Sequence, residues 1–168
     1  MKRTILLGIF WVAVTSFSNA QNAAGEFSGK VTSVVDGNTL EIKSTDNQNY
    51  TILLAGIDSP ELNQEYGDKA KRMLEKLSLE KQVTVRLKGK DRKGQDLAEV
   101  LVNGDEDIRI ELLKEGMAWT AERNPLPELE EHRVKAQQKG KGLWKQEDPT
   151  PPWTFRRQQT MIQAKSSN

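Results

Sequence analysis

The chain has 168 residues, of which 36% are hydrophobic and 29% charged, with no cysteine and one histidine. This length and balance fit one small soluble domain with accessory segments, and the lack of cysteine excludes disulfides and thiolate metal sites. The single histidine, His132, excludes multi-histidine zinc centres. It lies in a charged stretch that predicts the exposed face of a helix rather than a catalytic base.

The first twenty residues are predicted to be a secretory signal peptide. Lys2 and Arg3 precede an apolar run from Ile5 to Val14, and small and polar residues follow as far as Ala20. A charged start, a short apolar run and a small-residue end are the signature of such a segment. The run is too short for a transmembrane helix. We therefore expect export to a periplasm or to the medium, with no membrane anchor after signal removal.

The charge of the remaining chain is uneven along its length. Without the predicted signal peptide, 23 basic residues face 24 acidic ones, a net charge of −1. Residues 21–132 carry a net charge of −7, whereas residues 133–168 carry +6. Proteins that grip phosphate backbones without sequence preference are usually basic over the binding face. Only the C-terminal part of this chain supplies such an excess.

The predicted elements in chain order are three strands, a helix, two strands and further helices. The strands cover residues 29–35, 39–42, 50–56, 82–87 and 97–102. Apolar spacing predicts helices over 63–79 and 108–116, and opening prolines with a closing Gly140 predict a third over 126–139. This order predicts an α+β fold, a five-stranded barrel close to the OB plan with about three helices. The domain is expected over residues 27–157. The polar residues 158–168 are expected to be a disordered tail.

Two acidic residues follow the third predicted strand within four positions. Asp58, Ser59 and Glu61 surround Pro60, which fixes φ and favours extended geometry in the residue before it. Two carboxylates held at a strand end can bind a hard cation or act as a base and ligand pair. The alternative interpretation is a charged turn after a core strand.

Six short motifs follow one another along the chain: Val-Val-Asp36-Gly-Asn-Thr39, Leu-Ala-Gly-Ile-Asp58-Ser-Pro-Glu61, Tyr66-Gly-Asp-Lys-Ala70, Asp91-Arg-Lys-Gly94-Gln-Asp-Leu-Ala98, Leu113-Lys-Glu-Gly-Met-Ala-Trp119, and Gly142-Leu-Trp144 with Pro152-Trp-Thr-Phe-Arg-Arg157. In this order and spacing they resemble the staphylococcal (thermo)nuclease-like domain family, from about residue 29 to residue 157. The resemblance implies an OB-fold. In active members it also implies calcium-dependent cleavage of DNA or RNA phosphodiesters.

The resemblance also implies which positions carry the chemistry. Active members hold calcium with an aspartate of a D-G-D-T turn, an aspartate of a D-x-P-E turn and the carbonyl that follows the latter. A glutamate of the second motif activates water, and two arginines neutralise the phosphate. Here Asp58, the Ser59 carbonyl and Glu61 match, whereas Asn38 replaces the first aspartate. The two arginine positions hold Leu53 and Gln95.

These replacements predict a weakened site. Asn38 offers an oxygen without charge, so any calcium binding is expected to be weak. Leu53 cannot donate to phosphate, and Gln95 carries no charge. Cations that border the expected site could compensate; Arg92 and Lys93 are the candidate phosphate contacts, with Lys90 and Arg86 nearby in the sequence. Their alternative interpretation is an ordinary solvated loop and strand face.

Three functions remain open from the sequence. The first is an exported, catalytically impaired nuclease-like protein retained for binding nucleic acid or protein, with Arg156 and Arg157 in a basic C-terminal stretch. The second is a working calcium-dependent endonuclease with an altered site. The third is an interaction module of the cell envelope that binds no nucleic acid. The net charge of −1 and the two lost arginines count against the second.

Overall fold

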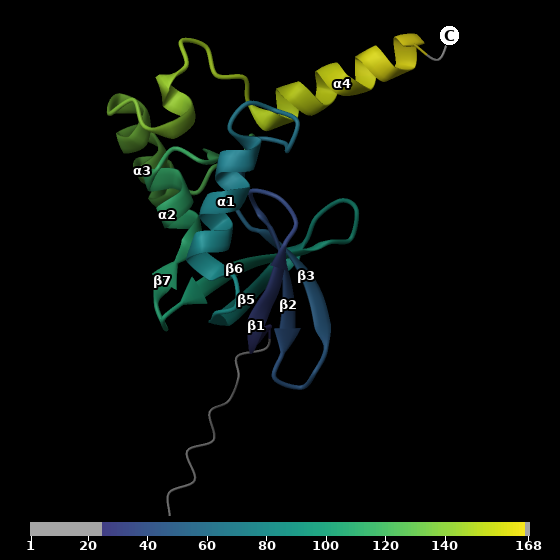
Figure 1. Ribbon diagram of the computed structural model, residues 1–168, viewed down its shortest axis with the longest axis vertical. Coiled ribbons are helices and arrows are strands. Elements are labelled where there is room, and N and C mark those ends of the chain that lie inside the picture. The colour runs from purple at the N-terminus through teal and green to yellow at the C-terminus, as the bar shows by residue number, and fades with distance from the viewer. Residues whose placement is uncertain (1–24, 167–168) are drawn as a thin grey trace, which may run out of the picture.

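The computed structural model describes residues 25–166, and the predicted signal peptide lies outside the described residues. Five long strands form the body (Figure 1): β1 (Glu26–Val34), β2 (Thr39–Ser44), β3 (Asn49–Leu54), β5 (Gln82–Lys90) and β6 (Asp96–Val102). They run in the order β3-β2-β1-β5-β6, and β3 also pairs with β6. This last pairing closes the barrel and leaves β3 without a free edge.

The closing pair is parallel, whereas the other pairs in the barrel are antiparallel. Leu53 lies opposite Leu97 across the β3–β6 seam. Alternate side chains on each strand point inward, as the period of two requires. They form the core, whose fully buried members include Val31, Leu40, Ile42, Ile52, Leu54, Val85 and Val100. The predicted five-stranded OB plan is confirmed, with strand ends shifted by a few residues.

The helices cover one side of the barrel. In the described residues they are α1 (Gly67–Ser78), α2 (Ile108–Lys114), α3 (Pro127–Gln138) and α4 (Pro152–Ser166), with a 3₁₀ turn, η1 (Gly142–Lys145). Three two-residue strands complete the fold: β4 (Ile57–Asp58), β7 (Glu106–Asp107) and β8 (Trp119–Thr120). Helix α1 buries Ala70 and Leu74 at helical spacing, and α2 buries Leu112 and Leu113. About three helices were expected, and α4 is the additional one.

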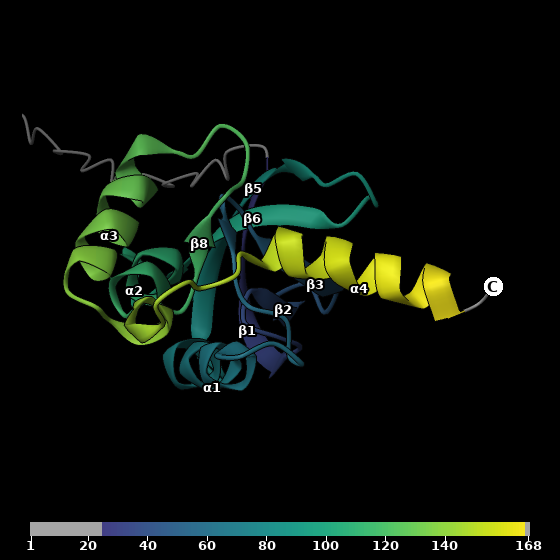
Figure 2. The same ribbon diagram turned by 90° about the horizontal axis from the view of Figure 1, so that it is seen from above.

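Helix α4 corrects the prediction of a disordered tail, because residues 158–166 continue it without a break. Its first residue is Pro152, which is preorganised for that position and is buried. Trp153 packs edge-on against Trp119 at 5.8 Å between ring centroids. Once this first turn is anchored, the costly nucleation step is complete, and residues of high helix propensity propagate the helix. Figures 1 and 2 show α4 starting over one end of the barrel and extending away from the body.

No helix within residues 25–166 combines the length and the apolar composition needed to cross a membrane.

Candidate active site

The turn between β1 and β2 is organised by Asp36. One carboxylate oxygen of Asp36 accepts from the Asn38 backbone N–H at 2.9 Å, and the other accepts from the Thr39 hydroxyl at 3.1 Å. An aspartate that satisfies the backbone two residues on is the usual reason for its presence in a turn. The Asn38 carbonyl in turn accepts from the Leu54 N–H at 2.9 Å. These bonds fix Asn38 beside the end of β3.

The second turn carries Asp58, and a buried arginine supports it. Gly56 has a φ of +79°, a conformation that favours glycine, and it lets the chain turn directly into β4. The Arg109 guanidinium, 7% exposed, donates to the Ala55 carbonyl at 3.0 Å and pairs with Asp107 at 2.6 Å. Strand β4 then pairs Asp58 with Trp119 of β8. The backbone of Asp58 is therefore held from both sides.

A buried hydrogen bond joins the two turns. The Ser59 hydroxyl donates to the Gly37 carbonyl at 2.9 Å, and Ser59 is only 2% exposed. The turns approach so closely that a Cβ added at Gly37 would lie 2.6 Å from the Ser59 Cβ and 2.8 Å from that of Ala70. A glycine is required here because of this contact. The consequence is that Asn38 and Asp58, 20 positions apart in sequence, open into the same cavity.

That cavity has a volume of about 610 Å³. It brings together the predicted residues Asn38, Leu53, Asp58, Glu61, Arg92, Lys93 and Gln95. Ser59 is not in the lining; its side chain is buried under the turn, and the prediction that its carbonyl binds a metal stays a prediction. The cavity also contains Asp36, Asp91, Glu122 and Arg156, so that five carboxylates face three cations. Lys90 and Arg86 are not in the lining; they pair with Asp96 and with Glu26 and Glu99.

Arg156 is the residue that the sequence did not place at the site. Its guanidinium donates to both oxygens of Asp58, at 3.1 and 2.7 Å, and to Glu61 at 2.6 Å. The Asp58 side chain is 18% exposed and that of Glu61 is 37% exposed. Two charge-assisted bonds to one carboxylate form the bidentate geometry that arginine favours. Arg156 comes from α4, so the helix that was not expected supplies a cation to the acidic pair.

The pKa of Asp58 lies above its ordinary value. Burial is the main cause, because it disfavours the charged carboxylate, and the nearby negative charges of Glu61 and Asp36 act in the same direction. The hydrogen bonds and the charge of Arg156 act in the opposite direction and offset only part of this. The surroundings of Asp58 therefore disfavour its charged form, and Arg156 is the cation that offsets part of this effect. Perturbed carboxylates in a cavity are typical of functional sites.

The residues present do not fit a calcium ion in this arrangement. Calcium takes six to eight oxygen ligands, of which several are ionised carboxylates. Both Asp58 oxygens accept from Arg156, and Glu61 is paired with the same guanidinium. Asn38 contributes no charge. Among residues 25–166, no set of three or more His, Asp or Glu side chains is arranged to hold a metal.

The sequence predicted that Arg92 and Lys93 border the site, but it did not predict which residues Arg156 contacts. Arg92 and Lys93 lie in the β5–β6 loop, where Asp91 orders the turn by accepting from the N–H groups of Lys93 and Gln95 at 2.8 Å. Arg156 is separated from Asp58 by 98 positions, and only its place in a basic stretch pointed to a role in binding. His132 does not line this cavity.

The sequence of this chain is similar to those of known nucleases and nuclease homologues. Residues 51–146 match the family described as staphylococcal nuclease homologue. An "Uncharacterized endonuclease" of Haemophilus influenzae is 35% identical over 162 residues, covering 96% of this chain and 87% of that protein. A "Micrococcal nuclease" of Shigella flexneri is 30% identical over 146 residues, covering 80% of this chain and 83% of that nuclease. With this barrel and these two turns in register, the chain belongs to the staphylococcal nuclease homologue family.

Proposed function

We propose that this protein is an exported, catalytically impaired member of its family that binds nucleic acid rather than cleaving it efficiently. The observation that carries the proposal is the position of Arg156. It donates to both oxygens of Asp58 and to Glu61, the two acids that would have to bind a cation and activate water. A carboxylate already paired with an intramolecular cation is a poorer ligand and a poorer base.

The loss of phosphate-binding cations supports the same conclusion. Leu53 lines the cavity where a guanidinium would neutralise charge that builds on the phosphate, and Gln95 carries no charge. Losing one such cation from a phosphoryl-transfer site costs roughly 10³ to 10⁵ in rate. Two losses in one site do not simply multiply, because residues that act together are not additive. A large deficit in turnover is still expected.

Weak calcium binding belongs to this proposal. An ion would have to displace Arg156 from Asp58 and would gain only a neutral oxygen from Asn38. Export belongs to it as well, and its support is the pattern of residues 1–20. Nucleic acid as the partner is supported by the names of the relatives, which are endonucleases and nucleases.

A working endonuclease is the second candidate, and one observation favours it. Arg92 and Lys93 line the cavity, and among the described residues their side chains form no ion pair. A cation displaced by a few positions from the usual one could reach a phosphate bound there. In this case Arg156 would leave Asp58 when substrate binds, or would itself contact the phosphate.

The test is digestion of single-stranded DNA and RNA by the purified mature protein, with calcium and with chelator. It is run beside a variant that carries Asn38→Asp, Leu53→Arg and Gln95→Arg, and beside the same variant with Arg156→Gln. We expect the natural protein to be silent and the fourfold variant to cut in a calcium-dependent way. This result would show that the scaffold is intact and that catalysis was lost at these positions.

Calcium-dependent cutting by the natural protein would overturn the proposal. Arg92→Gln and Lys93→Gln would then identify the cation that replaces the missing arginines. If the natural protein neither cuts nor binds an oligonucleotide at low salt, the interaction module of the cell envelope becomes the better description.

A further inference from the structure

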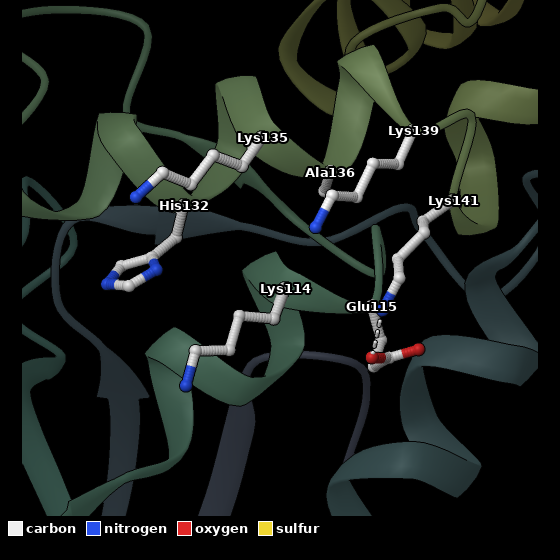
Figure 3. Close-up of a pocket in the computed structure, with 7 residues that line it drawn as sticks. All are labelled: Lys114, Glu115, His132, Lys135, Ala136, Lys139 and Lys141. Atoms are coloured by element: carbon white, nitrogen blue, oxygen red, sulfur yellow. Dashed lines mark hydrogen bonds and ion pairs between the residues drawn. The ribbon is translucent and has the colours of Figure 1, made fainter.

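A second cavity lies between α2 and α3 and shares no lining residue with the candidate active site. We call it the lysine groove. Its volume is about 330 Å³, and its lining includes Lys114, His132, Lys135, Lys139 and Lys141, with Glu115 as the acidic member. In Figure 3, Lys139 and Lys141 extend from the end of α3 and the turn beyond it towards α2, where Lys141 meets Glu115. Four lysines from two separate parts of the chain thus border one hollow.

Part of the charge excess noted in the C-terminal sequence lies here. Lys135, Lys139 and Lys141 come from the +6 segment, residues 133–168, and Lys114 joins them from α2. In the cavity at the barrel end the balance is reversed, since five carboxylates face three cations and Arg156 is held by two of those carboxylates. A polyanion that approaches the described surface is therefore attracted to the groove and opposed at the barrel end.

The groove lysines form exposed ion pairs in which a ligand can replace the glutamate. Lys141 pairs with Glu115 at 2.6 Å, Lys114 with Glu111 at 2.7 Å, and Lys135 with Glu131. The lysine side chains in these pairs are 40–57% exposed. Such exposed pairs contribute little to stability, so a phosphate can replace the glutamate at little cost. Lys139 has no ion pair among residues 25–166 and is available as it stands.

The lining also indicates how a ligand would be held. The one aliphatic side chain in the lining is that of Ala136, and the lining contains no Phe, Tyr or Trp ring; the His132 imidazole is its one ring. Lysines act as point charges towards phosphate and do not read bases. The exposed large apolar residues of the described chain, such as Leu126, Met161 and Ile162, do not line the groove. A surface that inserts into a membrane would present such residues beside its lysines.

We propose that the lysine groove binds the phosphate backbone of a nucleic acid, independently of sequence and without a metal ion. The proposal rests on the proposed function, because it names the surface by which an impaired nuclease homologue would retain its polyanion. Binding then occurs away from Asp58 and Glu61. Affinity for nucleic acid can therefore persist while these two carboxylates stay paired with Arg156.

The test is fluorescence anisotropy of a short labelled duplex in chelator, titrated with the mature protein from low to physiological salt. The groove variant carries Lys135→Gln, Lys139→Gln and Lys141→Gln. The control variant carries Lys43→Gln, Lys76→Gln and Lys165→Gln, which removes the same charge from exposed positions outside the groove. Circular dichroism checks that both remain folded.

We expect the groove variant to bind about tenfold to a hundredfold more weakly at low salt, and its slope of log affinity against log salt to be smaller by about 3. At physiological salt the control variant should stay within about threefold of the natural protein, because charges farther from the bound duplex than the Debye length of about 8 Å are largely screened. Equal losses in both variants would overturn the proposal, since net charge alone would then explain binding.

One further variant and a digest in calcium separate this inference from the proposed function. If Arg92→Gln with Lys93→Gln abolishes binding and the groove variant does not, the groove proposal fails while binding without cleavage stands. If the natural protein cuts the duplex in calcium and only the groove variant loses affinity, the proposed function fails and the groove remains. Absence of oligonucleotide binding together with groove-dependent binding to anionic vesicles would overturn the proposal in favour of a membrane surface.

Discussion

Replacement of Arg156 by glutamine tests most directly whether this arginine competes with a metal ion for Asp58 and Glu61. The substitution keeps much of the length of the side chain and removes its charge, so Asp58 and Glu61 lose their partner. We expect Arg156→Gln to raise the affinity for calcium. The physical reason is that an ion no longer has to compete with the guanidinium for the two Asp58 oxygens.

The magnitude follows from the two ion pairs. They have distances of 2.7 and 2.6 Å, but the Arg156 side chain is 48% exposed, so solvent screens them. Exposed pairs contribute about 0.2–1 kcal/mol each, which sets the competition from the two pairs at about 0.4–2 kcal/mol. Since about 1.4 kcal/mol corresponds to a factor of ten, calcium affinity should rise roughly twofold to thirtyfold. Isothermal titration calorimetry with calcium measures this directly.

Arg157→Gln is the matched control. Arg157 lies on the same helix and pairs with Glu122, which also lines the cavity, at 3.0 Å. It removes the same charge without freeing Asp58. Equal gains in affinity in the two variants would attribute the effect to net charge, and no gain in Arg156→Gln would refute the competition.

Three further outcomes are expected. In the natural protein Asp58 should titrate above its ordinary pKa of 3.8, and in Arg156→Gln its pKa should be higher still, because the arginine that lowers it is lost. Carboxyl carbon NMR measures both pKa values, and a lower pKa in the variant would contradict this reasoning. A raised folded pKa means that the contribution of Asp58 to stability is complete below the unfolded pKa and is lost as pH rises through the folded value. Gly37→Ala should destabilise the protein by about 1–3 kcal/mol in urea unfolding, because its Cβ would overlap Ser59; an unchanged midpoint would mean that the turns can separate freely. Arg109→Met should cost about 3 kcal/mol, since it leaves the half-buried Asp107 carboxylate without its cation and the Ala55 carbonyl without its donor; a thermal midpoint equal to that of the natural protein would refute a structural role for this arginine.

The barrel could be predicted because its signals are local. Strand alternation, the Asp36-Gly37 turn and the break at Gly56 each depend on neighbouring residues, and the register of the motifs located Asn38, Leu53, Asp58, Glu61 and Gln95. All five line one cavity. Helices α1 and α2 were predicted because their apolar residues recur at helical spacing, and α3 because prolines open it and Gly140 closes it.

The sequence by itself determined the barrel fold, and it predicted the candidate site residues, including Leu53 and Gln95 at positions where the resemblance implies arginines. Tertiary structure alone decided what α4 does. A polar segment carries no pattern that predicts order, and its helix depends on Pro152 and Trp153 docking against the body. That docking carries Arg156 to Asp58 across 98 positions. The lysine groove likewise exists only because α2 and α3 pack side by side, which brings Lys114 to the lysines that follow Arg133.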